Sequence, residues 1–175
     1  MVEPEARLDR PSFEGFVANR GAALQRTAFL LTGDWGHAED LLQTALARVY
    51  PRWERIVRDD PEAYVRKALV NTWSSWWRRK WRGELPTAEL HDRPGIDPYT
   101  DADRRGAVAT ALGGLPPKQR AVIVLRFHED LTEAQVADVL GISVGTVKSQ
   151  TAKALSKLRA DAALSGYGAP AAGGE

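Results

Sequence analysis

Apolar residues recur at intervals of three and four along most of the chain, and this spacing predicts amphipathic helices. The first predicted helix ends near Gly33, and its apolar positions are Phe13, Phe16, Val17, Leu24, Ala28 and Leu31. A second covers residues 37–50, immediately before Pro51. A third begins at Asp60-Pro61, because proline is favoured in the first turn of a helix. No segment alternates apolar and polar residues with a period of two, so we expect an all-α fold without strands.

A polar segment separates these helices from a second group. Residues 85–100 contain three prolines, one glycine and few apolar residues, a composition typical of a linker. Helical spacing resumes near Asp103, stops at Gly113-Gly114 and resumes again after Pro116-Pro117. We therefore predict two small helical domains: a bundle of three or four helices at residues 10–83 and a second domain at residues 104–164. A flexible acidic linker at 84–103 joins them, and we expect a disordered, low-complexity tail at 165–175.

Residues 131–158 carry the most specific local pattern in the chain. Thr132 and Gln135 have the spacing of a capping box, in which each side chain caps a backbone N–H of the other. Gly141 follows the short helix where a left-handed residue would turn the chain, and Ser143 can then cap a second helix. This arrangement predicts a helix-turn-helix. An ordinary helical hairpin with a polar outer side would show much of the same pattern.

The second helix of this pair has an outer face suited to the DNA major groove. Short, uncharged side chains allow a helix to lie deep in the groove, while lysines reach base edges or phosphates. No acidic residue occurs in residues 143–160. The candidate DNA-binding residues of this helix are Thr146, Lys148, Ser149, Lys153 and Lys157.

Four tryptophans alternate with basic residues at the end of the third predicted helix. The tryptophans are Trp73, Trp76, Trp77 and Trp81, and the basic residues are Arg78, Arg79, Lys80 and Arg82. An aromatic stripe at helical spacing is usually core, yet four indoles exceed what one small three-helix core can bury. Indole rings beside cations can also stack unpaired bases while the cations hold the phosphate backbone. The sequence leaves both interpretations open for each indole.

The net charge of +1 conceals an uneven distribution along the chain. Residues 61–82 have a net charge of +5, and residues 143–160 carry four cations and no acid. Residues 83–103, between them, have a net charge of −5. Either basic segment alone would be an ordinary solvated face, but both lie in helices with features of nucleic-acid binding.

Composition excludes several classes of protein. With no cysteine, the chain has no disulfide, thiol nucleophile or cysteine-ligated zinc. No apolar run is long enough to span a membrane, and the first residues lack the pattern of a signal peptide, so we expect a cytoplasmic protein. His37, His91 and His128 are isolated, and no metalloprotease or phosphate-binding motif occurs. We expect no enzyme activity and no cofactor.

Three segments together resemble a known family. AEDLLQTALARVY, DPEAYVRKALVNTW and LPPKQRAVIVLRFHEDLTEAQVADVLGISVGTVKSQTAKALSKLR are similar to domains two and four of the extracytoplasmic-function (group IV) sigma factors of the sigma-70 family. The last segment is most similar to an actinobacterial subgroup. The resemblance implies a subunit that binds core RNA polymerase, directs it to promoter DNA and helps to melt the minus-ten region. It leaves open whether an anti-sigma protein restrains the chain.

The resemblance also implies roles for individual residues. Those that match the surface for the clamp helices of the largest polymerase subunit are Asp40, Leu41, Leu42 and Gln43. Leu125 and Phe127 match the part that meets the flap of the second-largest subunit. Those that match the surface for the minus-ten element and its melted strand are Asn71, Trp73, Trp77, Arg78, Arg79 and Trp81. Lys148, Ser149 and Lys153 lie on the helix that reads the minus-thirty-five element.

The alternative is an autonomous helix-turn-helix regulator whose first domain senses a ligand or forms a dimer. It accounts for residues 131–158. It gives no reason for the clustered tryptophans and arginines or for the acidic linker.

Overall fold

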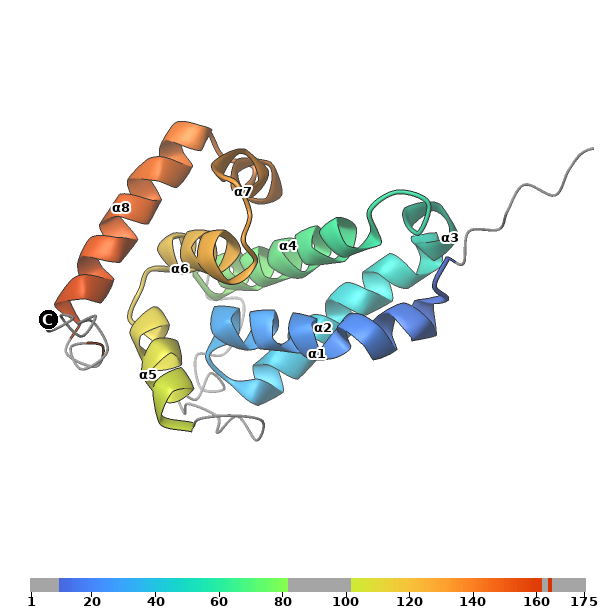
Figure 1. The fold of residues 1–175 in the computed structure, drawn as a ribbon, viewed down its shortest axis with the longest axis horizontal. Coiled ribbons are helices and arrows are strands. Elements are labelled where there is room, and N and C mark those ends of the chain that lie inside the picture. Colours follow the sequence, from blue (N-terminus) through green and yellow to red (C-terminus); the bar gives the residue numbers. More distant parts are fainter. Residues whose placement is uncertain (1–9, 82–101, 162–163, 165–175) are drawn as a thin grey trace, which may run out of the picture.

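A computed structural model describes residues 10–81, 102–161 and 164, and within these residues all regular structure is helical (Figure 1). The first group of elements is α1 (Phe13–Thr32), α2 (Trp35–Val49), the 3₁₀ turn η1 (Tyr50–Arg52), α3 (Trp53–Ile56) and α4 (Pro61–Trp81). The second group is α5 (Ala102–Gly113), α6 (Pro117–Ile123), the π-helical segment η3 (Val124–His128), α7 (Glu133–Leu140) and α8 (Val144–Ala160). The predicted all-α fold is confirmed. Most of the predicted linker and the predicted tail lie outside the described residues.

Local signals set the helix boundaries of the first domain. Ser12 Oγ accepts a hydrogen bond from the Gly15 N–H at 3.0 Å and so caps α1. At the other end, Gly33 adopts a left-handed conformation with φ of 77°. Asp34 Oδ1 then accepts from the His37 N–H at 2.9 Å, which starts α2. Because these contacts span only three residues, the boundary near Gly33 was predictable from sequence.

The core of the first domain lies between α1, α2 and α4. Its fully buried side chains include Leu31, Leu41, Val49, Val65 and Leu69. η1 and α3 were not predicted, because three or four residues are too few to show a helical period. They are held by tertiary packing: Trp53 of α3 is buried, its ring lies 5.0 Å from that of Phe16, and its indole N–H donates to the Pro11 carbonyl.

The predicted helix-turn-helix is present in the second domain. Thr132 and Gln135 form the reciprocal capping box, with hydrogen bonds of 2.8 and 3.2 Å. Gly141 has a φ of 65° and turns the chain, and Ser143 Oγ accepts from the Thr146 N–H to cap α8. α6 and α7 both pack against α8, whose inner residues Val147 and Ala154 are buried.

The two domains pack against each other, which the prediction of a flexible tether did not include. α7 contacts α4, and η3 and α5 contact α1 (Figure 1). Arg120 of α6 is only 7% exposed, and its guanidinium donates to the carbonyls of Leu112, Gly113 and Leu31 at 2.7–3.0 Å. Leu31 belongs to α1, so one buried arginine connects α6, α5 and the first domain.

We expect Arg120→Ala to lower the free energy of unfolding by about 2–4 kcal/mol, because a buried side chain is lost together with its hydrogen bonds to the carbonyls of Leu112, Gly113 and Leu31. Arg159→Ala removes the same side chain from an exposed position on α8 and should change stability by less than about 0.5 kcal/mol. Urea unfolding followed by circular dichroism at 222 nm measures both. Equal stability of the two variants would contradict a structural role for Arg120.

Candidate nucleic-acid interface

The outer face of α8 is polar, basic and free of acidic residues. Lys148, Ser149, Lys153 and Lys157 are exposed, and small side chains lie between them at Ala152 and Ser156. Burial of Val147 and Ala154 on the opposite side fixes which face points outward. Lys148 Nζ lies 3.8 Å from Glu133 Oε2 across the turn, and an exposed pair at this distance restrains the lysine only weakly.

Thr146 has a local role in the cap of α8. It is half-buried, and its Oγ1 lies 2.8 Å from Ser143 Oγ. Ser149 Oγ donates to the Thr146 carbonyl at 3.1 Å. The hydroxyls therefore order the first turns of α8, next to the exposed lysines.

α4 presents a second candidate surface, and the structure shows how deeply its aromatic residues Trp73 and Trp77 are buried. Trp73 is 4% exposed, and its indole N–H donates to the Leu31 carbonyl at 3.1 Å, so Trp73 lies in the core. Trp77 is half-buried, with its ring 6.4 Å from that of Trp73 in an edge-on arrangement. Asn71, Arg78 and Arg79 are exposed. The side chain of Trp81 lies outside the described part of the chain.

The residues predicted to bind polymerase divide into exposed and buried sets. On α2, Asp40 and Gln43 are exposed, whereas Leu41 and Leu42 are buried in the first domain. In η3, Leu125 is fully buried and Phe127 is 58% exposed. Only the exposed members present side chains to a partner in this conformation; the leucines hold their helices in place.

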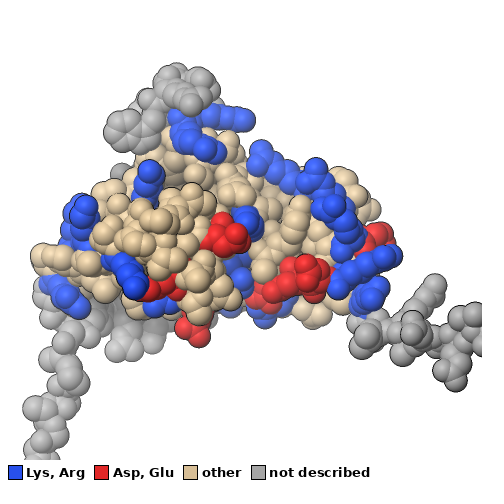
Figure 2. All heavy atoms as spheres, turned by 90° about the horizontal axis from the view of Figure 1, so that it is seen from above, with Lys and Arg blue, Asp and Glu red and all other residues tan. Residues whose placement is uncertain are grey.

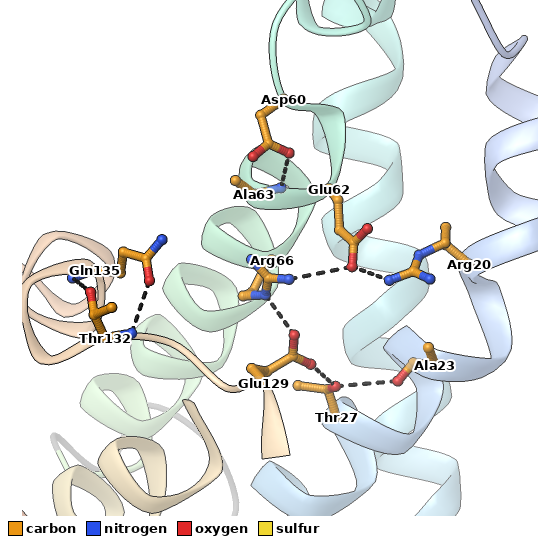
Figure 3. Close-up of polar contacts among 10 residues, drawn as sticks. All are labelled: Arg20, Ala23, Thr27, Asp60, Glu62, Ala63, Arg66, Glu129, Thr132 and Gln135. Carbon is orange, nitrogen blue, oxygen red and sulfur yellow. Dashed lines mark hydrogen bonds and ion pairs between the residues drawn. The ribbon is translucent and has the colours of Figure 1, made fainter. Parts of the chain in front are cut away.

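A polar cluster between the domains was not predicted from sequence. Glu129, which follows η3, accepts a hydrogen bond from Arg66 Nε of α4 at 2.6 Å and another from the Thr27 hydroxyl of α1 (Figure 3). Arg66 also pairs with Glu62, which in turn pairs with Arg20 of α1. The side chains of Arg66 and Glu129 are only 12% and 13% exposed. No local pattern could have revealed this contact, because its partners are 63 and 102 residues apart.

An ion pair and the His128 imidazole lie beside the interdomain cluster. Lys67 Nζ of α4 lies 3.0 Å from Asp138 Oδ2 of α7, and this pair is exposed. Partial burial lowers the pKa of the His128 imidazole; Glu129 opposes the shift and Arg26 of α1 adds to it. Acidic residues of the second domain thus face basic residues of the first, while α8 keeps an outer face without acids.

The space-filling view shows how charge is distributed over one face of the molecule. Lys and Arg side chains spread widely across it, whereas the Asp and Glu side chains lie mostly near its middle (Figure 2). Among residues 10–81, 102–161 and 164, no cluster of His, Asp and Glu side chains could hold a metal ion. None of the helices in these ranges has the length and apolarity needed to cross a membrane.

Comparison with known proteins places both domains in one family. Sigma-70 region 2 matches residues 16–83, and Sigma-70, region 4 matches residues 111–160. The RNA polymerase sigma-E factor of Streptomyces coelicolor is 43% identical over 148 residues, which are 84% of each chain. The ECF RNA polymerase sigma factor SigL of Mycobacterium tuberculosis is 30% identical over 162 residues, which are 89% of each chain.

Solved structures show the same fold. The sigma factor RpoE of Bartonella quintana, in complex with the anti-sigma factor NepR, matches with a TM-score of 0.68 at 23% identity, over 85% of this chain and 94% of that chain. CnrH, in complex with the cytosolic domain of CnrY, matches with a TM-score of 0.56 at 27% identity, over 85% of each chain. With both regions matched in order, and with relatives covered over most of their own length, this chain belongs to the sigma-70 family of RNA polymerase sigma factors, among its extracytoplasmic-function members.

Proposed function

We propose that this chain binds core RNA polymerase, directs it to specific promoters and helps to melt the minus-ten region. The observation that carries the proposal is the presence of two exposed basic helical surfaces, on α8 and α4, in domains that match sigma-70 regions 4 and 2. A promoter offers two separated elements. Two DNA-binding surfaces in one chain suit a protein that contacts both.

In this proposal α8 reads the minus-thirty-five element as duplex. Lys148 and Ser149 lie on one turn of its exposed face and Lys153 on the next, and these residues reach base edges, while Lys157 lies further along and reaches a phosphate. Ser143 and Thr146 fix the first turn. The buried Val147 and Ala154 keep the lysine face directed outward, which a groove-reading helix requires.

α4 holds the opened strand at the minus-ten element. Asn71 offers an exposed amide for a base edge, Arg78 and Arg79 offer charge for phosphates, and the half-buried Trp77 offers part of a ring for stacking. We leave Trp73 out of this surface, because it is buried and hydrogen-bonded to the first helix. Its role in the proposal is to hold α4 against α1.

Polymerase contacts α2 and the end of η3. Asp40 and Gln43 form the exposed side of α2, and Phe127 is a large apolar side chain in solvent, as expected for a residue that a partner covers. Two of the structural neighbours are complexes, one with NepR and one with CnrY. On that ground we propose an anti-sigma protein as a further partner.

We expect Lys153→Ala to weaken promoter-dependent transcription by about 1–3 kcal/mol, because the variant loses a contact to a base. Lys118→Ala removes the same charge from an exposed position on α6 and serves as the control. In vitro transcription over a range of salt concentrations measures the effect. If Lys153→Ala transcribes the cognate promoter as well as the control does, α8 is wrongly assigned.

We expect Asn71→Ala to reduce open-complex formation, because the variant loses the exposed amide that contacts a base edge. Helix content should not change, because Asn71 contributes no core packing. Asn19→Ala, an exposed asparagine on α1, is the matched control. Permanganate footprinting detects unpaired thymines directly. The assignment of α4 to the minus-ten element fails if both variants open the promoter equally.

The proposal as a whole is tested by DNA binding with and without core polymerase. We expect the isolated protein to bind duplex weakly, with strong dependence on salt and little sequence preference, and to become promoter-selective when core enzyme is added. An electrophoretic shift at near-physiological salt measures this. Nanomolar, sequence-specific binding by the isolated protein, unchanged by polymerase, would instead indicate an autonomous helix-turn-helix regulator.

A further inference from the structure

The first turn of α8 differs from the rest of its outer face. From Lys148 onward that face carries lysines and hydroxyl groups. In the first turn, the hydroxyls of Ser143 and Thr146 are directed at each other, 2.8 Å apart, and cap the helix. The exposed residues that remain in this turn are Val144 and Gly145.

Val144 is an apolar side chain outside the core. It is 39% exposed, and it is the one large apolar side chain exposed within residues 144–160, all of which the structure describes. Ile142 packs against the hydrophobic core and Val147 lies within it, whereas Val144 does neither. Valine is also a weaker helix former than the residues common on helix surfaces. Neither core packing nor helix propensity therefore accounts for Val144.

Gly145 is a glycine that the fold itself does not require. It has ordinary helical geometry, unlike the left-handed Gly141. A Cβ at Gly145 would lie 3.8 Å from Ser143 Oγ, an ordinary van der Waals distance, so the free protein has room for a side chain at this exposed position. Glycine is also less favourable than alanine in a helix. A glycine without an internal reason, on a face proposed to bind DNA, indicates a close approach by the partner.

The place of these two residues on α8 indicates what they meet. In a helix-turn-helix, the N-terminal residues of the second helix contact base edges in the major groove. Val144 and Gly145 lie one turn before Lys148 and Ser149, which the proposed function assigns to base edges. All base pairs present hydrogen-bonding groups in that groove, but only thymine adds a methyl group. An exposed apolar side chain at this point matches that methyl group.

We propose that Val144 contacts the C5-methyl group of a thymine in the minus-thirty-five element, and that Gly145 provides the clearance for this contact. The inference rests on the proposed function, because it requires α8 to lie in the major groove. It adds a base preference that the polar residues of α8 do not supply, because a methyl group takes part in no hydrogen bond with them. Val144 is then a residue that determines which promoters the chain selects.

Replacing thymine by uracil tests the contact directly, because it removes this methyl group and keeps the hydrogen-bonding groups of the base. The probe is a promoter that the full-length protein, together with core RNA polymerase, selects from a library randomised over the minus-thirty-five element. Each thymine of the element is replaced in turn, and binding is measured by competition. We expect uracil at one position to weaken binding of the parent about three- to fivefold, and binding of Val144→Ala less than about 1.5-fold.

Val108→Ala is the matched control for this measurement. Val108 lies on α5 of the same domain and is 43% exposed, and its truncation removes the same two methyl groups. It should keep the sensitivity of the parent to uracil. The thymine contact is overturned by equal sensitivity of Val144→Ala and Val108→Ala, by a parent that tolerates uracil at every position, or by a selected element without thymine.

Gly145→Ala tests the clearance separately from stability. We expect it to weaken promoter binding at least about tenfold, because the added methyl group holds α8 away from the base edges. Its midpoint of urea unfolding should be unchanged or higher, since alanine fits the free protein and favours the helix. Gly106→Ala on α5 is the control, because its methyl group would also meet nothing within 4 Å and should leave binding unchanged. Normal promoter binding by Gly145→Ala would contradict the clearance.

Failure of the proposed function gives a different result from failure of the thymine contact. A parent protein that shows no promoter selectivity with core polymerase would count against the function and the contact together. A parent that selects promoters but gives no uracil effect, or gives one that Val144→Ala retains, would overturn the contact and leave the function intact.

Discussion

The packing of both domains depends on the carbonyl of Leu31, at the end of α1. The last carbonyls of a helix have no partner within the helix, and a buried one must find a donor elsewhere. Leu31 accepts from the indole of Trp73 on α4 and from the guanidinium of Arg120 on α6. The left-handed turn at Gly33 leads the chain away and into α2. One backbone group thus fixes how α4 crosses α1 and where the second domain begins to pack.

Charge has a different role at the two helical surfaces. On α8, acids are absent and the lysines remain available. On α4, the first two cations are matched by acids of the second domain, Arg66 by Glu129 and Lys67 by Asp138. The same domain therefore presents one basic surface while its acids neutralise part of another.

The function of the family and the packing of the two domains place different demands on the molecule. A sigma factor acts at two separated promoter elements, yet in this structure α7 packs on α4, η3 and α5 pack on α1, and the buried guanidinium of Arg120 bonds to the Leu31 carbonyl. The contacts at Glu129 and Asp138 are ionic and confined to side chains.

The sequence by itself determined the features that depend on near neighbours. The capping box at Thr132, the turn at Gly141 and the cap at Ser143 each involve residues about three positions apart, so composition and spacing were sufficient to predict them. Helical periodicity likewise determined the all-α class and the outward face of α8. The short elements η1 and α3 escaped prediction, because too few residues carry their pattern.

Only the tertiary structure decided which side chains of those helices are available. Trp73 and Asn71 lie two residues apart on α4, yet one is buried and the other exposed, because the Leu31 carbonyl and the packing of α1 lie on one side only. Arg120 is a cation in a helix, yet it is buried, and its guanidinium donates to three carbonyls from two domains. Glu129 meets Arg66 and Thr27 across 63 and 102 residues. Such contacts depend on how whole helices pack, and no local spacing encodes that packing.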